Sequence, residues 1–199
     1  MIPEFSDIQR RNLDMMMSGE LYQAANPVLL DILSDVQEQC FRLNNLSPSM
    51  TEEREAILRR LLGRTGKRFK IISPFFCDYG FNIEVGENFF ANTNLVILDE
   101  AKVTFGDNVF IAPNCSFYTA GHPLEGDLRR DGYDYSWPIT VGDNVWFGGG
   151  VTVVPGVTIG SDTVIGAGSV VTHDIPSGVL AAGNPCRIIR QIPKRKNLG

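Results

Sequence analysis

A period of six residues is the feature of this 199-residue sequence that most constrains its fold. From Val141 onward, six units follow one another without an insertion: VGDNVW, FGGGVT, VVPGVT, IGSDTV, IGAGSV and VTHDIP. The first place of each unit is apolar, and the fifth holds Val, Ile, Thr or Ser. Six residues cannot bury their own apolar positions, so we expect the units to stack as short strands of a solenoid, with both places pointing inward. The predicted inward residues are Val141, Val145, Phe147, Val151, Val153, Val157, Ile159, Thr163, Ile165, Ser169, Val171 and Ile175.

Weaker copies of the same unit extend the predicted solenoid over residues 69–183. VGENFF, ANTNLV and ILDEAK run from Val85, two extra residues then shift the phase, and FGDNVF and IAPNCS follow from Phe105. Gly, Asn and Asp after each strand suit the sharp corners that a solenoid requires. The repeat is lost in YTAGHPLEGDLRRDGYDYSWP, at about residues 118–138. This stretch is polar and rich in turn residues, so we predict an excursion loop there.

Residues 1–68 carry helical rather than strand patterns. Ser and Asn are good helix N-caps, and Ser49-Met-Thr-Glu52 has the spacing of a capping box. We expect the helices to form a cap over the open end of the solenoid, because unpaired strand edges and apolar side chains would otherwise be exposed there. The predicted helices begin at Ser6 or Asp7, after Asn26-Pro27, and at Ser49, and the last two end near Asn44-Asn45 and at Gly63.

The charge and hydropathy of the chain exclude several classes of partner. A formal net charge of −5 gives the surface no overall basic field, so we expect neither nucleic acid nor an anionic membrane as a partner. No apolar run approaches the roughly 18–20 residues of a membrane span, and MIPEFSDIQRR lacks the apolar core of a signal peptide. The cysteines are scattered without a C-x-x-C pair, which favours reduced thiols. These features predict a soluble, cytoplasmic protein.

Specific motifs accompany the repeats and carry a family resemblance. They are GELYQAANP, FFCDYGFNI, FFANTN, YTAGHP, ITVGDNVWFGGG, PGVTIG, IGAGSVVT and GNPCRIIR. With these motifs, the chain closely resembles the maltose and galactoside O-acetyltransferases over nearly its whole length. The resemblance implies a mainly β fold, a left-handed parallel β-helix with an N-terminal α-helical cap and an excursion loop. It also implies acetyl-CoA as donor, a sugar hydroxyl as acceptor, and a homotrimer with active sites at the subunit interfaces.

The reaction implied by this resemblance needs a general base. The acceptor hydroxyl has to lose its proton as its oxygen attacks the thioester, and histidine suits this task because its ordinary pKa is about 6.5. The resemblance places the catalytic histidine at His122, in YTAGHP. Our hypothesis is direct attack without an acyl-enzyme intermediate. The residues alone leave open that His122 is only an exposed loop histidine.

A sugar acceptor presents several hydroxyls, which carboxylates and amides bind in pairs. The resemblance implies acceptor contacts at Asp78, Asn92 and Glu100. Glu100 stands where we expect aspartate from the relatives, and its extra methylene changes its reach. Asp134 falls where the galactoside enzymes have an apolar contact, which predicts a different acceptor preference. Each of these polar residues could instead be a corner or surface residue.

Coenzyme A calls for an apolar wall, backbone hydrogen bonds and cations. The transfer also forms a tetrahedral intermediate with a negatively charged oxygen, and the resemblance implies that the Gly149 amide faces this oxyanion. Relatives often carry serine at the position of Gly149. Gly148 and Gly150 are expected to be corner residues. Trp146 is expected to flank the pantetheine arm, although it could simply pack, and His173 replaces a lysine of several relatives. Residues 184–199, ending in PKRK, are predicted to be a coenzyme A-contacting tail. The predicted cofactor-binding residues are Trp146, Gly149, Ala167, Thr172, His173, Arg187 and Arg190, the two arginines meeting the phosphates.

Other functions are compatible with parts of this pattern. A structural solenoid, such as an adhesive or ice-binding rod, has no need for an excursion loop that exposes a histidine. A zinc enzyme on the same solenoid holds its metal with three histidines, and this chain has only His122 and His173, so we expect no metal. Within acyl transfer, the alternative acceptors are an antibiotic, an amino sugar or serine. Failure to bind coenzyme A would favour a non-catalytic binding role.

Overall fold

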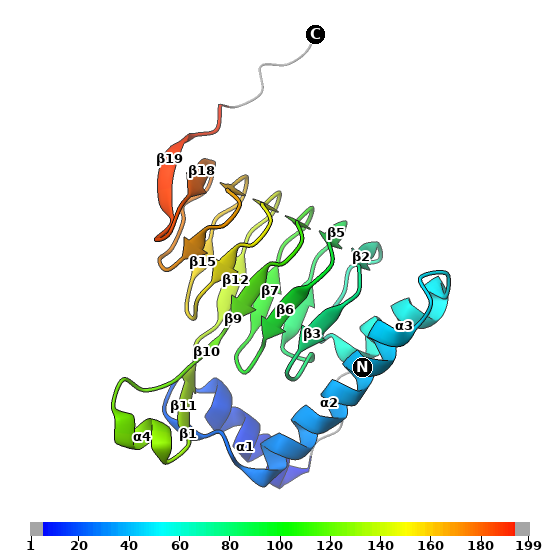
Figure 1. Ribbon diagram of the computed structural model, residues 1–199, viewed down its shortest axis with the longest axis vertical. Coiled ribbons are helices and arrows are strands. Elements are labelled where there is room, and N and C mark those ends of the chain that lie inside the picture. Colours follow the sequence, from blue (N-terminus) through cyan, green and yellow to red (C-terminus); the bar gives the residue numbers. More distant parts are fainter. Residues whose placement is uncertain (1–5, 194–199) are drawn as a thin grey trace.

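The computed structural model describes residues 6–193. Helices cover one end of a β-solenoid built of stacked turns, and the C-terminal strands lie at the opposite end (Figure 1). The charged residues of PKRK and the rest of the predicted tail, 194–199, lie outside the described residues. Over the described range, no helix combines the length and the apolar character needed to cross a membrane.

The N-terminal helices are α1 (Asp7–Met17), α2 (Pro27–Asn45) and α3 (Thr51–Leu61). α1 begins with a capping box in which Ser6 and Gln9 satisfy each other's backbone N–H groups. The Asn26 side chain caps α2 by accepting from the Val28 N–H at 2.9 Å, and proline occupies the first helical turn. The predicted starts of these two helices are confirmed.

The capping box predicted for the third helix is wrong. Met50 is the N-cap residue of α3 and makes no side-chain hydrogen bond to the first turn. The Ser49 hydroxyl pairs with the Ser47 hydroxyl at 2.9 Å, so it is engaged before the helix begins. At the other end, the helix stops before Gly63 as predicted. A Cβ at Gly63 would lie 2.1 Å from the Phe81 carbonyl oxygen, so only glycine permits this close approach.

Within residues 6–193 the solenoid strands form three parallel faces that the chain visits in a repeating order. The four-stranded face contains β4 (Ile83–Val85), β7 (Val103–Phe105), β12 (Ile139–Val141) and β15 (Thr158–Ile159). The seven-stranded face contains β2 (Phe69–Ile71), β5 (Phe89–Ala91), β8 (Phe110–Ile111), β13 (Trp146–Phe147), β16 (Val164–Ile165), β18 (Val179–Ala182) and the antiparallel β19 (Arg187–Gln191). The five-stranded face contains β3 (Phe75–Cys77), β6 (Leu95–Leu98), β9 (Ser116–Tyr118), β14 (Thr152–Val153) and β17 (Val170–Val171). The predicted mainly β, parallel β-helix is confirmed.

The solenoid interior is a column of stacked side chains. All the predicted inward residues are buried, none of them more than 6% exposed. Thr163 and Ser169 donate their hydroxyls to backbone carbonyls at 3.0 and 2.5 Å, so their burial is compensated. Neighbouring rings along the column have centroids 5.0 to 5.2 Å apart, and these rings are Phe89, Phe105, Phe117 and Phe147.

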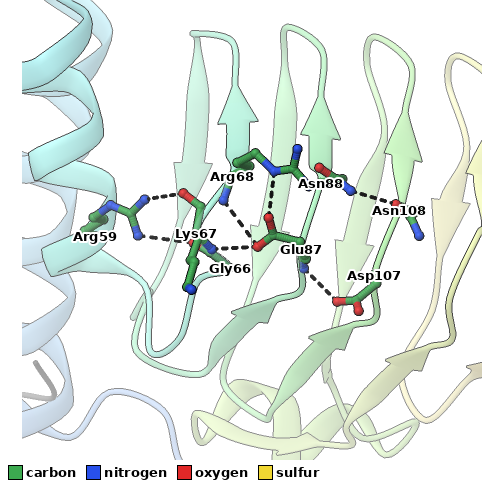
Figure 2. A network of polar contacts seen from close by, with 8 residues as sticks. All are labelled: Arg59, Gly66, Lys67, Arg68, Glu87, Asn88, Asp107 and Asn108. Atoms are coloured by element: carbon green, nitrogen blue, oxygen red, sulfur yellow. Dashed lines mark hydrogen bonds and ion pairs between the residues drawn. The ribbon is translucent and has the colours of Figure 1, made fainter.

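Asparagines in the left-handed conformation form the corner between the four-stranded and seven-stranded faces. Asn88, Asn108 and Asn144 have φ of 56°, 55° and 56°. Asn88 Nδ2 donates to Asn108 Oδ1 at 3.0 Å, and Asn108 Nδ2 donates to Asn144 Oδ1 at 3.1 Å. Figure 2 shows the first rung of this asparagine ladder beside Glu87, whose N–H donates to Asp107 at 2.7 Å. The corner of each of these turns is thus hydrogen-bonded to the corner of the next turn.

The cap is fastened to the first turns of the solenoid. The Asn44 side chain of α2 both donates to the Phe75 carbonyl and accepts from the Phe75 N–H, each at 2.9 Å. Arg59 of α3 donates to the carbonyls of Gly66 and Lys67 at 3.2 and 2.8 Å (Figure 2). The helices therefore cover the open end of the solenoid through specific hydrogen bonds.

The predicted excursion has regular structure that its polar sequence did not indicate. It contains β10 (Ala120–Gly121), α4 (Gly126–Arg130) and β11 (Tyr133–Ser136). β11 pairs antiparallel with β10 and also with β1 (Tyr22–Gln23) of the cap segment. The excursion, α1 and β1 lie together beside the solenoid (Figure 1). The loop therefore folds back onto the N-terminal cap.

Candidate active site

His122 follows β10 and is held by a carboxylate of the neighbouring strand. Its Nδ1 atom is hydrogen-bonded to a carboxylate oxygen of Asp134, in β11. An ionised carboxylate can only accept, so Nδ1 is the donor in this contact, and Nε2 takes no part in it. The His122 side chain is 69% exposed, whereas that of Asp134 is 16% exposed. An exposed imidazole that a carboxylate orients in this way is chemically suited to accept a proton from a ligand.

A cluster of carboxyl groups lies at the corner between the five-stranded and four-stranded faces. Asp99 is fully buried and accepts from the N–H groups of Asp78 and Tyr79 at 3.0 and 2.9 Å. Burial, with the nearby charge of Asp78, raises the pKa of Asp99 to about 7. Its Oδ2 atom is buried without a hydrogen-bond partner among residues 6–193. Asp99 therefore supports the backbone that carries Asp78.

Asp78 and Glu100 form a coupled pair in this cluster. Burial, with the neighbouring Asp78 carboxylate, raises the pKa of Glu100 to about 9. Burial also raises the pKa of Asp78, and a hydrogen bond from Glu100 opposes this. Glu100 therefore holds its proton at neutral pH and donates it in a hydrogen bond to Asp78. Such a pair can both accept from and donate to hydroxyl groups.

Two buried tyrosines connect the carboxyl cluster with the His122–Asp134 pair. Burial, followed by the nearby acidic groups of Glu100, Tyr79, Asp134 and Asp78, raises the pKa of Tyr22. The pKa of Tyr79 is raised by burial and by the same carboxylates. Both phenols are therefore neutral and within electrostatic reach of all three acidic groups.

Thr119 links Glu100 to the strand that leads into His122. Its hydroxyl donates to the Leu98 carbonyl at 2.7 Å, accepts from the Ala101 N–H at 3.0 Å and lies 3.4 Å from Glu100 Oε2. Thr119 is fully buried, so these contacts fix the last turn before the excursion. Asp78, Glu100 and His122 thus belong to one side of the molecule.

Other predicted residues lie at the corner between the seven-stranded and five-stranded faces. Asn92, Gly149 and Ala167 occupy stacked turns there. A Cβ on Gly148 would lie 2.5 Å from Ala167 N, so the stacking requires glycine at this corner position. A Cβ on Gly149 would meet only the Pro113 carbonyl oxygen, at 3.3 Å. The packing of the corner is therefore less restrictive at Gly149 than at Gly148.

Exposed aromatic residues run beside this corner on the seven-stranded face. Phe90, Phe110 and Trp146 are register partners on successive strands, and we call them the aromatic ladder. Phe110 is 48% exposed and Trp146 54% exposed. A hollow of about 530 Å³ is lined by the ladder together with Asn92 and Ala112. Trp146 is therefore a surface residue beside Asn92 rather than part of the core.

The remaining predicted cofactor residues lie toward the C-terminal end of the solenoid. The Thr172 hydroxyl and His173 Nδ1 are hydrogen-bonded at 2.8 Å, just after β17. Arg187 and Arg190 lie on β19, where every residue is exposed. Arg190 is the register partner of Leu180 on β18. Both arginines are thus available to an anionic ligand at this end.

One chain does not bring all the predicted site residues together. Asp78, Glu100 and His122 follow strands of the five-stranded face, on the side where the chain passes to the four-stranded face. Asn92 and Gly149 precede strands of the five-stranded face and therefore lie on its other side. The width of that face separates the two groups within a chain. Among the described residues, no group of His, Cys, Asp or Glu side chains is arranged to hold a metal ion.

Several site residues were not predicted as such. Asp134 was expected to affect the acceptor, and the structure pairs it with His122. Tyr22, Tyr79 and Thr119 lie within GELYQAANP, FFCDYGFNI and YTAGHP, but the sequence alone assigned them no role. Phe90 and Phe110 had a readable signal, because both occupy the sixth place of a hexapeptide unit, as Trp146 does.

Comparison with known proteins agrees with this architecture. A family described as the maltose acetyltransferase hexapeptide capping motif matches residues 15–66, and one described as bacterial transferase hexapeptide (six repeats) matches residues 138–173. Galactoside O-acetyltransferase of Escherichia coli is 49% identical over 155 residues, which cover 78% of this chain and 76% of that protein.

Solved structures agree with the sequence matches. A maltose O-acetyltransferase from Clostridium difficile has a TM-score of 0.90 and 47% identity, covering 92% of this chain and 98% of the other. A galactoside acetyltransferase in complex with coenzyme A has a TM-score of 0.88 and 43% identity, covering 92% and 91%. The cap and the repeats thus agree with these matches, and the chain belongs to the maltose and galactoside O-acetyltransferase family of hexapeptide-repeat acetyltransferases.

Proposed function

We propose that this acetyltransferase moves the acetyl group of acetyl-CoA onto a hydroxyl of a sugar, with His122 as general base. The observation that carries the proposal is the His122–Asp134 pair, which lies on the same side of the molecule as the hydrogen-bonded carboxyl pair of Glu100 and Asp78. A mixed donor and acceptor pair suits a polyhydroxyl acceptor. The maltose and galactoside enzymes among the similar proteins support the same class of acceptor.

The proposed reaction is a direct transfer. His122 Nε2 takes the proton of the acceptor hydroxyl while the hydroxyl oxygen bonds to the thioester carbonyl carbon. The resulting tetrahedral oxyanion is stabilised by the Gly149 N–H, and it collapses with release of the coenzyme A thiolate, which takes the proton from the His122 imidazolium. Asp134 keeps the imidazole in the correct tautomer and stabilises the imidazolium that forms.

The proposed donor site runs along the seven-stranded face. The aromatic ladder offers an apolar wall for the pantetheine arm, and Arg187 and Arg190 offer cations for the phosphates. The coenzyme A bound to the similar galactoside enzyme supports this donor. His173 would contribute less to phosphate binding at neutral pH than the lysine of several relatives.

We also propose that the active site is completed in a homotrimer, at the interface between neighbouring copies. The support is that His122 and the Asn92–Gly149 corner lie on opposite sides of the five-stranded face. In a cyclic head-to-tail assembly, each copy presents one of these sides to its neighbour. Co-expression of His122→Ala with Asn92→Ala should then restore part of the activity that each variant lacks. Lack of recovery in verified mixed oligomers would contradict a shared site.

The reaction is tested by release of thiol from acetyl-CoA. The acceptor panel contains maltose, glucose, galactosides, amino sugars, serine and chloramphenicol, each with wild type and His122→Ala. Release with one sugar, abolished in His122→Ala, supports the acceptor class and the base together. Release only with serine or chloramphenicol would contradict the sugar acceptor, and full turnover in His122→Ala would contradict the base.

A further inference from the structure

The strand that carries Asp134 is held by the N-terminal cap as well as by the excursion. β11 pairs with β10 along one edge and with β1 along the other. A two-stranded hairpin alone is marginally stable in water, so the third strand contributes to fixing β11. Tyr22 of β1 is the register partner of Asp134, which places the cap strand directly beside the carboxylate that binds His122.

Two side chains at the end of β11 anchor it to the cap. The fully buried Ser136 donates its hydroxyl to the Met16 carbonyl at 2.6 Å. Met16 lies in the last turn of α1, where carbonyls have no partner within the helix, so Ser136 satisfies one of them. Trp137 Nε1 donates to the Gly19 carbonyl at 3.2 Å. These bonds fix β11 relative to the end of α1.

The start of β11 is anchored to the same cap segment. Gln23 Nε2 donates to the Asp131 carbonyl at 3.2 Å, and the Ala24 N–H donates to the Gly132 carbonyl at 3.0 Å. The cap segment from Met16 to Ala24 therefore contacts β11 before, beside and after Asp134.

The other member of the pair is also positioned from β11. A Cβ on Gly121 would lie 2.5 Å from the Tyr135 ring, so this ring closes directly on the backbone that precedes His122. Arg129 donates to the carbonyls of Pro123 and Leu124 at 2.7 and 2.8 Å, which fixes the backbone that follows His122. A shift of β11 would therefore move both His122 and Asp134.

From these contacts we infer that the cap segment 16–24 positions the His122–Asp134 pair for catalysis, with Ser136 and Trp137 as its positioning residues. The inference rests on the proposed function, because it takes His122 as the base. It gives the N-terminal segment a part in the reaction in addition to covering the end of the solenoid.

The test removes one anchoring hydrogen bond at a time. Ser136→Ala loses the bond to Met16, and Trp137→Phe loses the bond to Gly19 while it keeps a ring on a side chain that is 45% exposed. We expect kcat to fall about 10-fold in each, because a small displacement of a catalytic group slows the reaction strongly. The KM for acetyl-CoA should not change. In protein labelled with ¹⁵N-histidine, the His122 Nδ1–H signal should broaden through exchange with water.

The matched control is Asn44→Ala, which loosens the cap at α2 without touching β11. It should lower the Tm and leave kcat and the His122 signal unchanged. An equal loss of kcat in Asn44→Ala, or wild-type kcat and signal in both Ser136→Ala and Trp137→Phe, would overturn the inference. The signal is identified by its absence in His122→Ala. Full turnover in His122→Ala would instead refute the base of the proposed function, while the His122 signal still reports the positioning.

Discussion

The Nδ1 atom of His122 and the carboxylate of Asp134 are hydrogen-bond partners although twelve positions separate them along the chain. The antiparallel pairing of β10 with β11 brings them together. The excursion therefore both exposes a histidine and supplies the group that orients it.

Substitution Asp134→Asn should lower kcat on the order of 10²-fold, the lower range of what a general base contributes. The amide keeps the shape of the side chain but removes the negative charge that stabilises the imidazolium, and it no longer dictates which nitrogen holds the proton. Steady-state kinetics at saturating acetyl-CoA measure the effect. Asp131→Asn is the control, because the side chain of Asp131 forms an exposed ion pair with Arg130 and the substitution leaves its backbone contacts in place. Equal kcat in wild type and Asp134→Asn would mean that the carboxylate has no part in orienting the base.

The glycines at 148 and 149 should respond differently to serine. Gly148→Ser should lower the Tm strongly, because its Cβ would lie 2.5 Å from Ala167 N. Gly149→Ser should lower the Tm much less, since its Cβ meets only the Pro113 carbonyl oxygen, at 3.3 Å, and a shift of a few tenths of an ångström relieves that contact. It should raise kcat several-fold, because a hydroxyl beside the amide adds a donor for the oxyanion. A Gly149→Ser protein with wild-type Tm but reduced kcat would place the hydroxyl in the path of the thioester.

The two arginines of β19 should affect the binding of acetyl-CoA rather than the rate of the chemical step. Arg187→Ala and Arg190→Ala should each raise the KM for acetyl-CoA about 10-fold, which corresponds to loss of one charge-assisted hydrogen bond. The kcat at saturation should be unchanged, and the difference should shrink at high salt. Arg64→Ala, which removes a surface ion pair with Glu84, is the control. A lowered kcat with unchanged KM would argue against a phosphate contact.

Asn108 tests how the corners are stabilised. It has φ of 55°, and its side chain joins Asn88 to Asn144 in the asparagine ladder. Asn108→Gly and Asn108→Ala lose the same hydrogen bonds, but only alanine adds strain in the left-handed region. Asn108→Ala should therefore be less stable than Asn108→Gly by about 1–2 kcal/mol in denaturant unfolding. Equal stability would show that the corner relaxes out of this conformation.

The solenoid could be predicted in detail because each hexapeptide unit repeats the same local rule. The burial of Val141, Phe147 and their equivalents follows from one period, and Thr163 and Ser169 could be placed inside by position alone. The start of α2 was equally predictable, because Asn26 and Pro27 act within one turn. The start of α3 was not, since Ser47 competes for the Ser49 hydroxyl.

The structure of the candidate site around His122 was less predictable because it depends on contacts between residues far apart in the sequence. The strand pairing of Tyr22 with Asp134 joins two short segments that have no strong pattern of their own. The alternation in YDYS was a weak signal for β11. His122 was found through family resemblance, whereas its partner Asp134 required the pairing of β10 and β11 to be known.

Glu100 should make the stability of the protein depend on pH in a direction opposite to that of an ordinary paired carboxylate. Its folded-state pKa is raised to about 9, mainly by burial, whereas a carboxyl in an unfolded chain has a pKa of about 4.3. Between these values the folded state binds more protons than the unfolded state, so this group's contribution to stability falls as pH rises. Glu100→Gln keeps the shape and cannot ionise.

Thermal unfolding of Glu100→Gln and wild type should therefore give similar Tm values near pH 5 and a higher Tm for the variant near pH 9. Glu84 is the control with the opposite sign, because hydrogen bonding and charge from Lys102 and Arg64 lower its pKa. Glu84→Gln should lose stability at neutral pH, and this loss should vanish as pH falls through the lowered pKa. If Glu100→Gln were less stable than wild type at pH 9, Glu100 would be ionised there in a favourable environment, and the proton shared with Asp78 would be the wrong description of the acceptor site.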